Sequence, residues 1–251
     1  MSVFMIFRSY FCSLLLKGVM LQFFSKYKLL ARVLLGLSIV IVTIFYSILK
    51  PAEVLPVYQP SEVSAALVSQ EIRHQKKYHT ISNFSLTNQN GQTITQDTYK
   101  DKIYVADFFF TTCQTICPVM TGNMLELQNK LINNPQVLLL SHTVMPEVDS
   151  VAQLKKYATQ KKVNPTKWNL VTGNKQEIYN LARKQYLVAK ENPEDPLGLV
   201  HTENFVLIDT NKRIRGFYDG TQAQEMDRIL HDIDVLQNQG KKSIFFGLIN
   251  Y

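Results

Sequence analysis

The N-terminal fifth of the chain is dominated by apolar side chains, whereas the remainder shows short apolar segments separated by polar turns. Residues 29–49 form a 21-residue run that is almost entirely apolar, with Arg32 near its start. A helix rises about 1.5 Å per residue, so this run would measure roughly 31 Å and could cross a bilayer core. Arg32 is close enough to the end to reach the membrane interface. The pattern predicts a single transmembrane helix over Leu29–Leu49.

Charge asymmetry around this span predicts its orientation. Residues 1–28 contain only basic charged residues, and Lys50 is the one basic residue from 50 to 70. The positive-inside rule then places residues 1–28 in the cytoplasm and everything after Lys50 on the extracytoplasmic, periplasmic side. A cleaved signal peptide is the alternative, but the apolar core is long for one and residues 49–51 lack an A-x-A-like site. Translation could also begin at Met20 instead of Met1.

The net charge of +7 arises mostly from this N-terminal region. Five of the 27 basic residues precede residue 50 and no acidic residue does, so residues 50–251 carry 22 basic and 20 acidic residues, a net of +2. A nearly neutral body offers no electrostatic basis for binding nucleic acid.

Residues 50–78 resemble a tether, because three prolines are followed by a polar stretch that we expect to be helical over 61–70. His74 and His79 lie among basic residues here. We interpret them as solvated surface residues rather than a metal-binding pair, since no further ligand is near in sequence.

Residues 79–240 show the periodicities of alternating strands and helices. Asn90-Gly91 predicts a tight β-hairpin, Pro118 suits the first turn of a helix, and Asp149 or Ser150 would cap another. The expected strands are a hairpin within 81–94, Ile103–Phe110, Val137–Leu140, Trp168–Val171, Phe205–Ile208 and Arg213–Tyr218; the expected helices follow Pro118 and cover about 150–161, Glu177–Tyr186 and Ala223–Leu236. This order predicts an α/β domain with a thioredoxin-like central mixed sheet flanked by helices. Residues 241–251 would form a tail, too short to span a membrane, that packs against the domain or a partner.

Two thiols lie at the first turn from strand to helix. Cys113 and Cys117 follow the strand, and Pro118 comes directly after them. A helix N-terminus favours thiolate over thiol, so the pair could perform redox chemistry or bind a soft metal. A purely structural disulfide is less attractive, because the loop it would close is very short.

A metal site at this turn would need a further ligand. Two sulfurs are too few for a closed zinc site, whereas a low-coordinate copper site needs one more donor, and imidazole suits copper. Of the five histidines after residue 50, His201 precedes the strand Phe205–Ile208, which in this fold should neighbour the strand that leads to the cysteines. His231 is expected at the surface.

The block from about residue 81 to 236 resembles the SCO/SenC family of thioredoxin-like copper proteins that act in cytochrome oxidase assembly. The resemblance is carried by Phe-Phe-Thr-Thr-Cys-x-x-x-Cys-Pro at 109–118 and Leu-Val-His-Thr-Glu-Asn-Phe-Val-Leu-Ile-Asp at 199–209. It implies that Cys113, Cys117 and His201 are ligands of copper, as Cu(I) or Cu(II). It also implies delivery to the copper-bearing subunit of a cytochrome c oxidase, with a copper donor or thiol reductant acting upstream.

One segment departs from the family pattern. Where the family often has Val-Asp-Pro, this chain has Ser141-His142-Thr143-Val144-Met145-Pro146. His142 and Met145 could assist copper transfer, although we favour a structural role for both.

Two other functions remain open. An extracytoplasmic thiol–disulfide oxidoreductase would attack with Cys113 and resolve with Cys117, but such enzymes use C-x-x-C and carry proline where this chain has His201. The chain could also be an interaction module with unused thiols. The leading hypothesis is a membrane-anchored copper chaperone without catalytic turnover.

Overall fold

The computed structural model describes residues 27–49, 53–64, 67–68, 71–189 and 202–249. The chain divides into two compact units, residues 1–52 and 53–251, which we describe separately. In the first unit, helix α2 covers Lys28–Leu49, as the apolar run predicted. Its stretch Lys28–Tyr46 is long and apolar enough to cross a membrane by length and composition.

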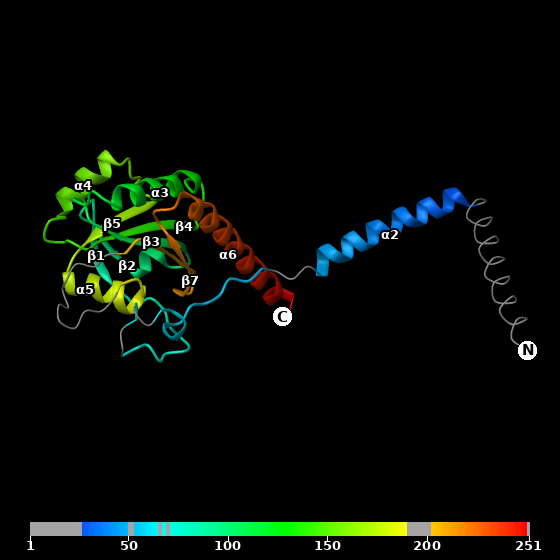
Figure 1. Ribbon diagram of the computed structural model, residues 1–251, viewed down its shortest axis with the longest axis horizontal. Helices are drawn as coiled ribbons and strands as arrows, with labels where there is room; N and C mark the ends of the chain where they lie inside the picture. The colour runs from blue at the N-terminus through cyan, green and yellow to red at the C-terminus, as the bar shows by residue number, and fades with distance from the viewer. Residues whose placement is uncertain (1–26, 50–52, 65–66, 69–70, 190–201, 250–251) are drawn as a thin grey trace, which may run out of the picture. The chain divides into compact units, whose positions relative to one another are not determined.

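The second unit is built on a mixed seven-stranded sheet in the order β2-β1-β5-β4-β3-β6-β7 (Figure 1). Strand β4 pairs in parallel with β3 and β5, and the other pairings are antiparallel. The strands are β1 Ser85–Asn88, β2 Thr93–Thr95, β3 Ile103–Phe109, β4 Val137–Thr143, β5 Trp168–Thr172, β6 Asn204–Ile208 and β7 Ile214–Asp219. The thioredoxin-like mixed sheet and its leading hairpin are thus confirmed. Gly91 has a φ of 76°, a left-handed conformation that glycine adopts readily in the hairpin turn.

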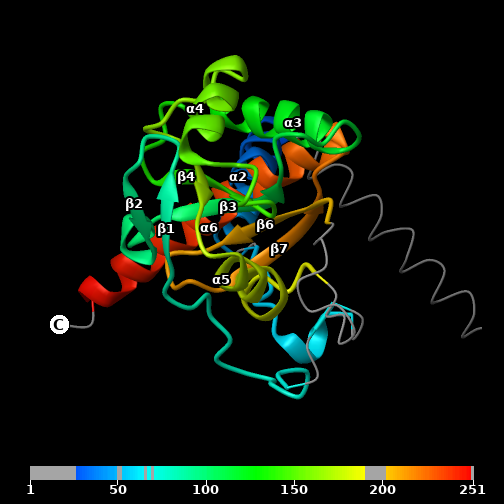
Figure 2. The ribbon, with the colours of Figure 1, turned by 90° about the vertical axis from the view of Figure 1, so that its left-hand side faces the viewer.

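Helices cover both faces of this sheet. They are α3 Cys117–Lys130, α4 Val151–Gln160, α5 Lys175–Asn180, which continues as a π-helical turn over Leu181–Gln185, and α6 Ala223–Ile249. Helices α3 and α4 lie on one side of the sheet and α5 on the other (Figures 1 and 2). Alternate residues of β3 point to opposite faces, so Val105 and Phe109 join the core under α3, α4 and α6, while Tyr104 and Phe108 join the core under α5.

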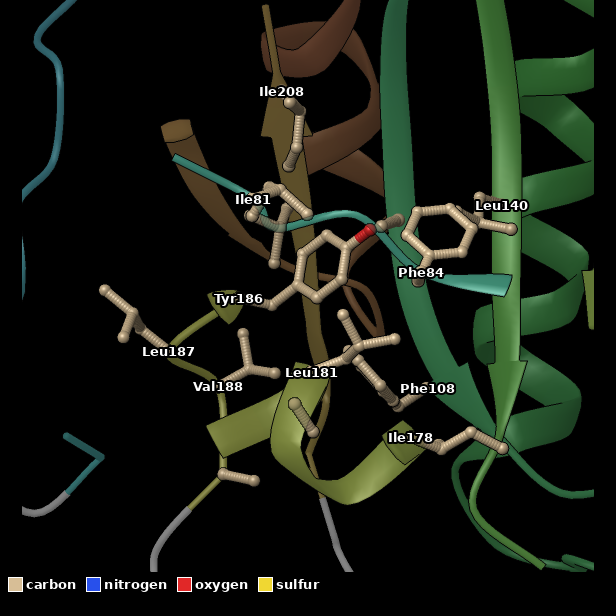
Figure 3. Close-up of a cluster of buried hydrophobic side chains, with 14 of the residues drawn as sticks. Ile81, Phe84, Phe108, Leu140, Ile178, Leu181, Tyr186, Leu187, Val188 and Ile208 are labelled. Carbon is tan, nitrogen blue, oxygen red and sulfur yellow. The ribbon is translucent and has the colours of Figure 1, made fainter. Parts of the chain in front are cut away.

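The core under α5 is rich in aromatic rings. Figure 3 shows Tyr186 at its centre, between aliphatic side chains of the turn after α5 and Phe84 from the segment before β1. The hydroxyl groups of Tyr186 and Tyr104 are 3.3 Å apart, which gives each buried phenol a polar partner. This packing closes the sheet face opposite α3.

The segment after α2 is more ordered than the predicted tether. Leu55 and Val68 are buried, and Arg215 on β7 donates hydrogen bonds to the carbonyl oxygens of Leu55 at 2.7 Å and Pro56 at 2.8 Å. The compact unit therefore begins at Glu53, whereas the sequence suggested residue 79. The expected helix over 61–70 is wrong for the described residues, which contain only a 3₁₀ turn at Pro60–Glu62.

Helix α6 differs from its predicted end. It continues through Ile249 rather than stopping near Leu236, so most of the expected tail is helical. Both candidate start methionines, Met1 and Met20, lie outside the described residues.

Candidate functional site

The two cysteines lie in the loop that joins β3 to α3 and at the start of α3. Cys117 is the first residue of α3, directly before Pro118, while Cys113 lies in the loop and its backbone N–H donates to the carbonyl of Phe110 at 3.3 Å. Both are free thiols; Cys117 is buried and Cys113 is partly exposed. Cys113, the attacking thiol of the oxidoreductase alternative, is thus the more exposed member of the pair.

Their surroundings separate the acidities of the two thiols. Partial burial tends to raise the pKa of Cys113, but hydrogen bonds from Cys117 and Thr115 outweigh it and lower the pKa to about 7. Burial, together with the hydrogen bond to Cys113, raises the pKa of Cys117 to about 12. The expectation that the helix N-terminus favours thiolate at both positions is therefore wrong for Cys117, because desolvation of the charged form dominates there.

A buried carboxylate fixes the start of the cysteine loop. Asp149 is fully buried and accepts from the backbone N–H of Thr111 at 3.1 Å and from the Thr111 hydroxyl at 2.5 Å. The hydroxyl of Thr143, the last residue of β4, donates to the same carboxylate. Asp149 thus ties the loop two residues before Cys113 to the end of the neighbouring strand.

From its place in the sequence, Asp149 is expected only as a possible helix cap. The structure shows that Ser150 caps α4, since its side chain accepts from the backbone N–H of Gln153. No local spacing in the sequence signals the contact of Asp149 with Thr111, because 38 residues separate them.

A second buried carboxyl group lies on the sheet beneath Cys117. Asp107 is 2% exposed, and burial raises its pKa to about 7, although the hydroxyl of Ser141 donates to it. Ser141 in turn accepts from the indole N–H of Trp168 at 2.8 Å. The other oxygen of Asp107, Oδ1, has no hydrogen-bond partner among the described residues. Its negative charge is one reason why the pKa of Cys117 is high.

His142 and Met145 belong to the packing of the opposite face. The His142 ring is fully buried and stacks on Phe108 with 4.8 Å between ring centroids, and burial lowers its pKa to about 4. Met145 packs against the same core under α5. Since Cys117 belongs to the other core, the structure supports the structural role that we favoured for both residues.

The remaining histidines differ in whether the structure describes them and in how deeply they are buried. His201 lies outside the described residues. The strand that follows it, β6, pairs with β3, as the topology predicted, and its N-terminal end lies where β3 leads into the cysteine loop. His231 is exposed, as expected, and so is His74. The prediction for His79 is wrong: it is buried, and its Nε2 lies 2.8 Å from the carbonyl oxygen of Gln185.

No group of three or more metal-binding side chains occurs within the part of the chain that the structure describes. The described portion of the site is therefore the cysteine pair with its supporting carboxyl groups. A partly exposed thiol of low pKa beside a buried thiol can serve as soft metal ligands or as a dithiol redox couple.

The fold and the cysteine turn define a thioredoxin-like protein with a C-x₃-C pair at the first helix. Residues 72–237 match the family model described as SCO1/SenC. The chain belongs to this family.

Individual relatives agree with this assignment. The SCO1 protein homolog of Bacillus subtilis (strain 168) is 33% identical over 166 residues, which are 65% of this chain and 86% of that protein. The structure of BsSco, a member of the Sco family of cytochrome c oxidase assembly proteins in which a disulfide switch was identified, is 30% identical with a TM-score of 0.55. The match covers 64% of this chain and 95% of the BsSco chain. The structure of Arabidopsis thaliana ScoI with copper bound is 25% identical, with a TM-score of 0.50, and the match covers 62% of this chain and 98% of the ScoI chain.

Proposed function

We propose that this protein is a membrane-anchored copper chaperone that binds copper through Cys113, Cys117 and His201. It would deliver the ion to the copper-bearing subunit of a cytochrome c oxidase during assembly. The observation that carries the proposal is the cysteine pair of a SCO1/SenC family member, held between β3 and α3 with one thiol accessible. Copper bound to a solved family member, Arabidopsis thaliana ScoI, supports the choice of metal.

The chemistry of the pair suits a transferable ion. Thiolates are soft ligands that prefer Cu(I), and an imidazole completes a low-coordinate set. Cys113, whose pKa is about 7, is partly ionised at neutral pH, whereas Cys117 has to lose its proton when the metal binds. Copper is cargo here, so an acceptor's thiolates would replace these ligands stepwise without release of free ion.

The proposed location follows from α2 and the charge asymmetry. Helix α2 would span the inner membrane once, with residues 1–28 in the cytoplasm and the domain on the periplasmic side. There a dithiol would tend to oxidise, so a thiol reductant or a copper donor would be needed to load it.

An anaerobic Cu(I) titration of the reduced full chain in detergent tests this function. The background should carry Cys12→Ser, so that only the proposed thiol pair remains. We expect one tightly bound copper per chain, weakened by Cys113→Ser, by Cys117→Ser and by His201→Ala. His231→Ala, which removes an exposed histidine, is the matched control and should leave the affinity unchanged.

A thiol–disulfide oxidoreductase is the second candidate. It is favoured by one observation, the contrast between an accessible thiol of pKa about 7 and a buried thiol of pKa about 12. Cys113 would attack a substrate disulfide and Cys117 would resolve the mixed disulfide. If His201→Ala left copper affinity intact while the protein reduced an oxidase-derived peptide disulfide, this second function would replace the first.

A further inference from the structure

One aromatic residue of the domain is exposed in a backbone conformation that aromatic residues rarely adopt. Tyr78, in the segment before β1, is 90% exposed and has a φ of 66°. A left-handed φ strains a bulky side chain, whereas glycine adopts it readily. The exposed ring gains almost no packing that would offset this strain. Neither the backbone nor the core accounts for a tyrosine at this position, and strain of this kind is typical of residues that contact a partner.

The backbone on both sides of Tyr78 is held in place by hydrogen bonds. The side-chain amide of Gln75 donates to the carbonyl oxygen of Lys77 at 3.1 Å. On the other side, the backbone N–H of His79 donates to the side chain of Gln59 at 3.0 Å, and the His79 side chain is itself buried. The Tyr78 ring therefore extends into solvent from a fixed backbone.

Basic side chains precede this ring. Four exposed residues that are basic or carry an imidazole lie within the five positions before Tyr78: Arg73, His74, Lys76 and Lys77. Neither lysine forms an ion pair with any residue that the structure describes. The acidic residue just before this stretch, Glu71, is already paired with Lys184 at 2.7 Å. Residues 73–78, which we call the Tyr78 segment, thus present positive charge beside an exposed aromatic ring.

The Tyr78 segment lies toward the end of the sheet at which β3 begins. Ile81, three residues after Tyr78, donates its backbone N–H to the carbonyl oxygen of Lys212 in the β6–β7 turn at 2.8 Å. This turn is level with the start of β3, because β3 and β6 are antiparallel. Three residues span at most about 11 Å, whereas the cysteine loop follows the far end of the seven-residue strand β3, about 23 Å along it. The Tyr78 segment and the cysteine pair are thus toward opposite ends of the domain.

We propose that the Tyr78 segment docks on an anionic lipid surface, with the Tyr78 ring at the headgroup boundary and Lys76 and Lys77 beside the lipid phosphates. Charge complementarity selects an anionic partner, and each lysine near such a surface strengthens binding roughly fivefold. Tyrosine favours the headgroup boundary, because its ring is apolar and its hydroxyl is polar. A lipid surface is favoured over an acidic protein, because a single ring on a short segment offers little shaped area for a protein to match.

The residues that carry this inference all belong to the domain. It rests on the proposed membrane anchoring only because the anchor supplies the bilayer. Docking through the Tyr78 segment would occupy one end of the sheet and leave the cysteine loop, at the other end, accessible to an acceptor.

Tryptophan quenching by brominated lipid tests the docking. The full chain carries one tryptophan, Trp168, which is 1% exposed and provides a constant background. Tyr78→Trp adds a reporter in the segment, and Val148→Trp adds a matched reporter at an exposed position of the β4–α4 loop, at the cysteine end. Each is reconstituted in vesicles of phosphatidylcholine, alone or mixed with phosphatidylglycerol, with or without bromination near the headgroup end of the acyl chains. We expect Tyr78→Trp to lose most of its added emission only in brominated vesicles that contain phosphatidylglycerol, and Val148→Trp to lose none in any.

Two sets of variants test the charge and the strain. In the Tyr78→Trp chain, Lys77→Gln should lower the ratio of docked to undocked protein roughly fivefold. Lys156→Gln, which changes an exposed lysine of α4, is the control and should leave this ratio unchanged. Tyr78→Gly should unfold at a higher urea concentration than Tyr78→Ala, because only glycine adopts the left-handed φ without strain. Equal effects of the two lysine changes, or equal unfolding midpoints, would contradict the inference.

Two further measurements separate failure of this inference from failure of the proposed function. Retention of the chain on vesicles after alkaline carbonate reports anchoring, and Cu(I) titration of the same samples reports the metal site. If the chain is retained and binds copper but Tyr78→Trp is not quenched, the lipid docking is overturned and the chaperone function stands. Equal quenching in phosphatidylcholine alone overturns the recognition of anionic lipid. A chain that carbonate extracts overturns the anchoring and the inference with it.

A protein occupant would give a different result. Amine labelling of Lys76 and Lys77 in the full chain should decrease when phosphatidylglycerol is present in the vesicles. If it decreased instead only on addition of the soluble copper-bearing domain of an oxidase, the partner would be a protein and the lipid assignment would be overturned.

Discussion

At the residue scale, the two cysteines are chemically distinct although four positions apart. Cys113 is partly exposed and accepts hydrogen bonds that stabilise its thiolate, so its pKa is about 7. Cys117 is buried, donates to Cys113, and lies near the charge of Asp107, so its pKa is about 12. An incoming metal or disulfide therefore meets Cys113 first, and Cys117 follows once a partner compensates its desolvated charge.

We expect alkylation of the reduced chain by iodoacetamide to show this difference directly. The modification rate of Cys113 should rise with pH to half its maximum near pH 7, because the thiolate is the nucleophile. Cys117 should react far more slowly throughout, and peptide mapping separates both from Cys12. Cys117→Ala removes a hydrogen-bond donor and should move the Cys113 midpoint upward. Equal reactivity of the two thiols at neutral pH would contradict the environments described.

Asp107 is a buried acid whose ionisation should cost stability. Burial raises its pKa from 3.8 to about 7, so the folded state favours the protonated form. Its contribution is greatest below about pH 4 and is lost as the pH rises through about 7. The upper limit of this loss is on the order of 4 kcal/mol of unfolding free energy. The lowered pKa of His142 acts in the opposite direction over the same range, so the Asp107 effect has to be isolated.

Comparison of the variant Asp107→Asn with the parent separates the pH-dependent contribution of Asp107 from that of His142. We expect the unfolding free energy of the variant relative to the parent to increase from pH 4 to pH 8, measured in urea by Trp168 fluorescence. Asp97→Asn, which changes an exposed carboxylate of the same domain, is the control and should stay parallel to the parent. A constant difference between Asp107→Asn and the parent across this range would show that Asp107 is ionised throughout.

At the scale of elements, the cysteine loop depends on the loop before α4. Asp149 accepts from Thr111 in one loop and from Thr143 at the end of β4, and the side chain of Gln153 also donates to the Thr111 hydroxyl at 3.0 Å. These bonds fix where β3 ends and the approach to Cys113 begins. The thiol pair is thus positioned by an element that contributes no proposed ligand.

Asp149→Asn should therefore affect both stability and copper. Hydrogen bonds to a buried charged group contribute roughly 1.5–3 kcal/mol each, so we expect a loss of about 2 kcal/mol in unfolding free energy. We also expect weaker Cu(I) binding in anaerobic titration, because Cys113 loses its fixed backbone. Glu147→Gln is the control: Glu147 forms an exposed ion pair with Lys175 at 2.8 Å, and losing it should cost at most about 1 kcal/mol. Unchanged copper affinity in Asp149→Asn would limit Asp149 to a purely structural role.

The elements themselves were largely predictable, because their signals are local. Gly91 marks the hairpin, Pro118 the start of α3 and Ser150 the cap of α4, and each lies where the structure has it. The failures involve contacts distant in sequence. Residues 61–70 are polar enough for a surface helix, yet Val68 is buried in the core under α5. The polar neighbours of His79 in sequence are typical of a surface, but the residue is buried and its Nε2 contacts the carbonyl oxygen of Gln185.

The candidate site was predictable only in part. Spacing and resemblance selected Cys113 and Cys117, but the high pKa of Cys117 depends on how deeply the turn is buried. Asp107 also gave no signal, because an acid inside an apolar strand cannot be assigned a depth from its neighbours alone. The role of His201 stays a prediction.

At the scale of the whole molecule, the domain depends on the segment that leads into it. The guanidinium of Arg215 is 5% exposed and contacts Asp209 at 2.8 Å, and its other donors go to the carbonyl oxygens of Leu55 and Pro56. A buried cation left without acceptors destabilises a fold strongly. The segment that begins at Glu53 therefore belongs to the cooperatively folding domain, although its prolines and polar residues resemble those of a linker.

Two truncations test this boundary. A chain that begins at Glu53 keeps every acceptor of Arg215, and we expect it to retain the unfolding free energy and copper affinity of the full chain. A chain that begins at His79 loses the carbonyl groups of Leu55 and Pro56 together with the buried side chains of Leu55 and Val68. Those losses should lower the unfolding free energy by on the order of 5 kcal/mol, measured in urea by Trp168 fluorescence. Adding Arg215→Met to the shorter chain should recover part of the loss, because it removes the guanidinium donors whose carbonyl acceptors are missing, while Asp209 keeps its ion pair with Arg213. Equal stability of the two truncations would mean that residues 53–78 are a passive tether after all.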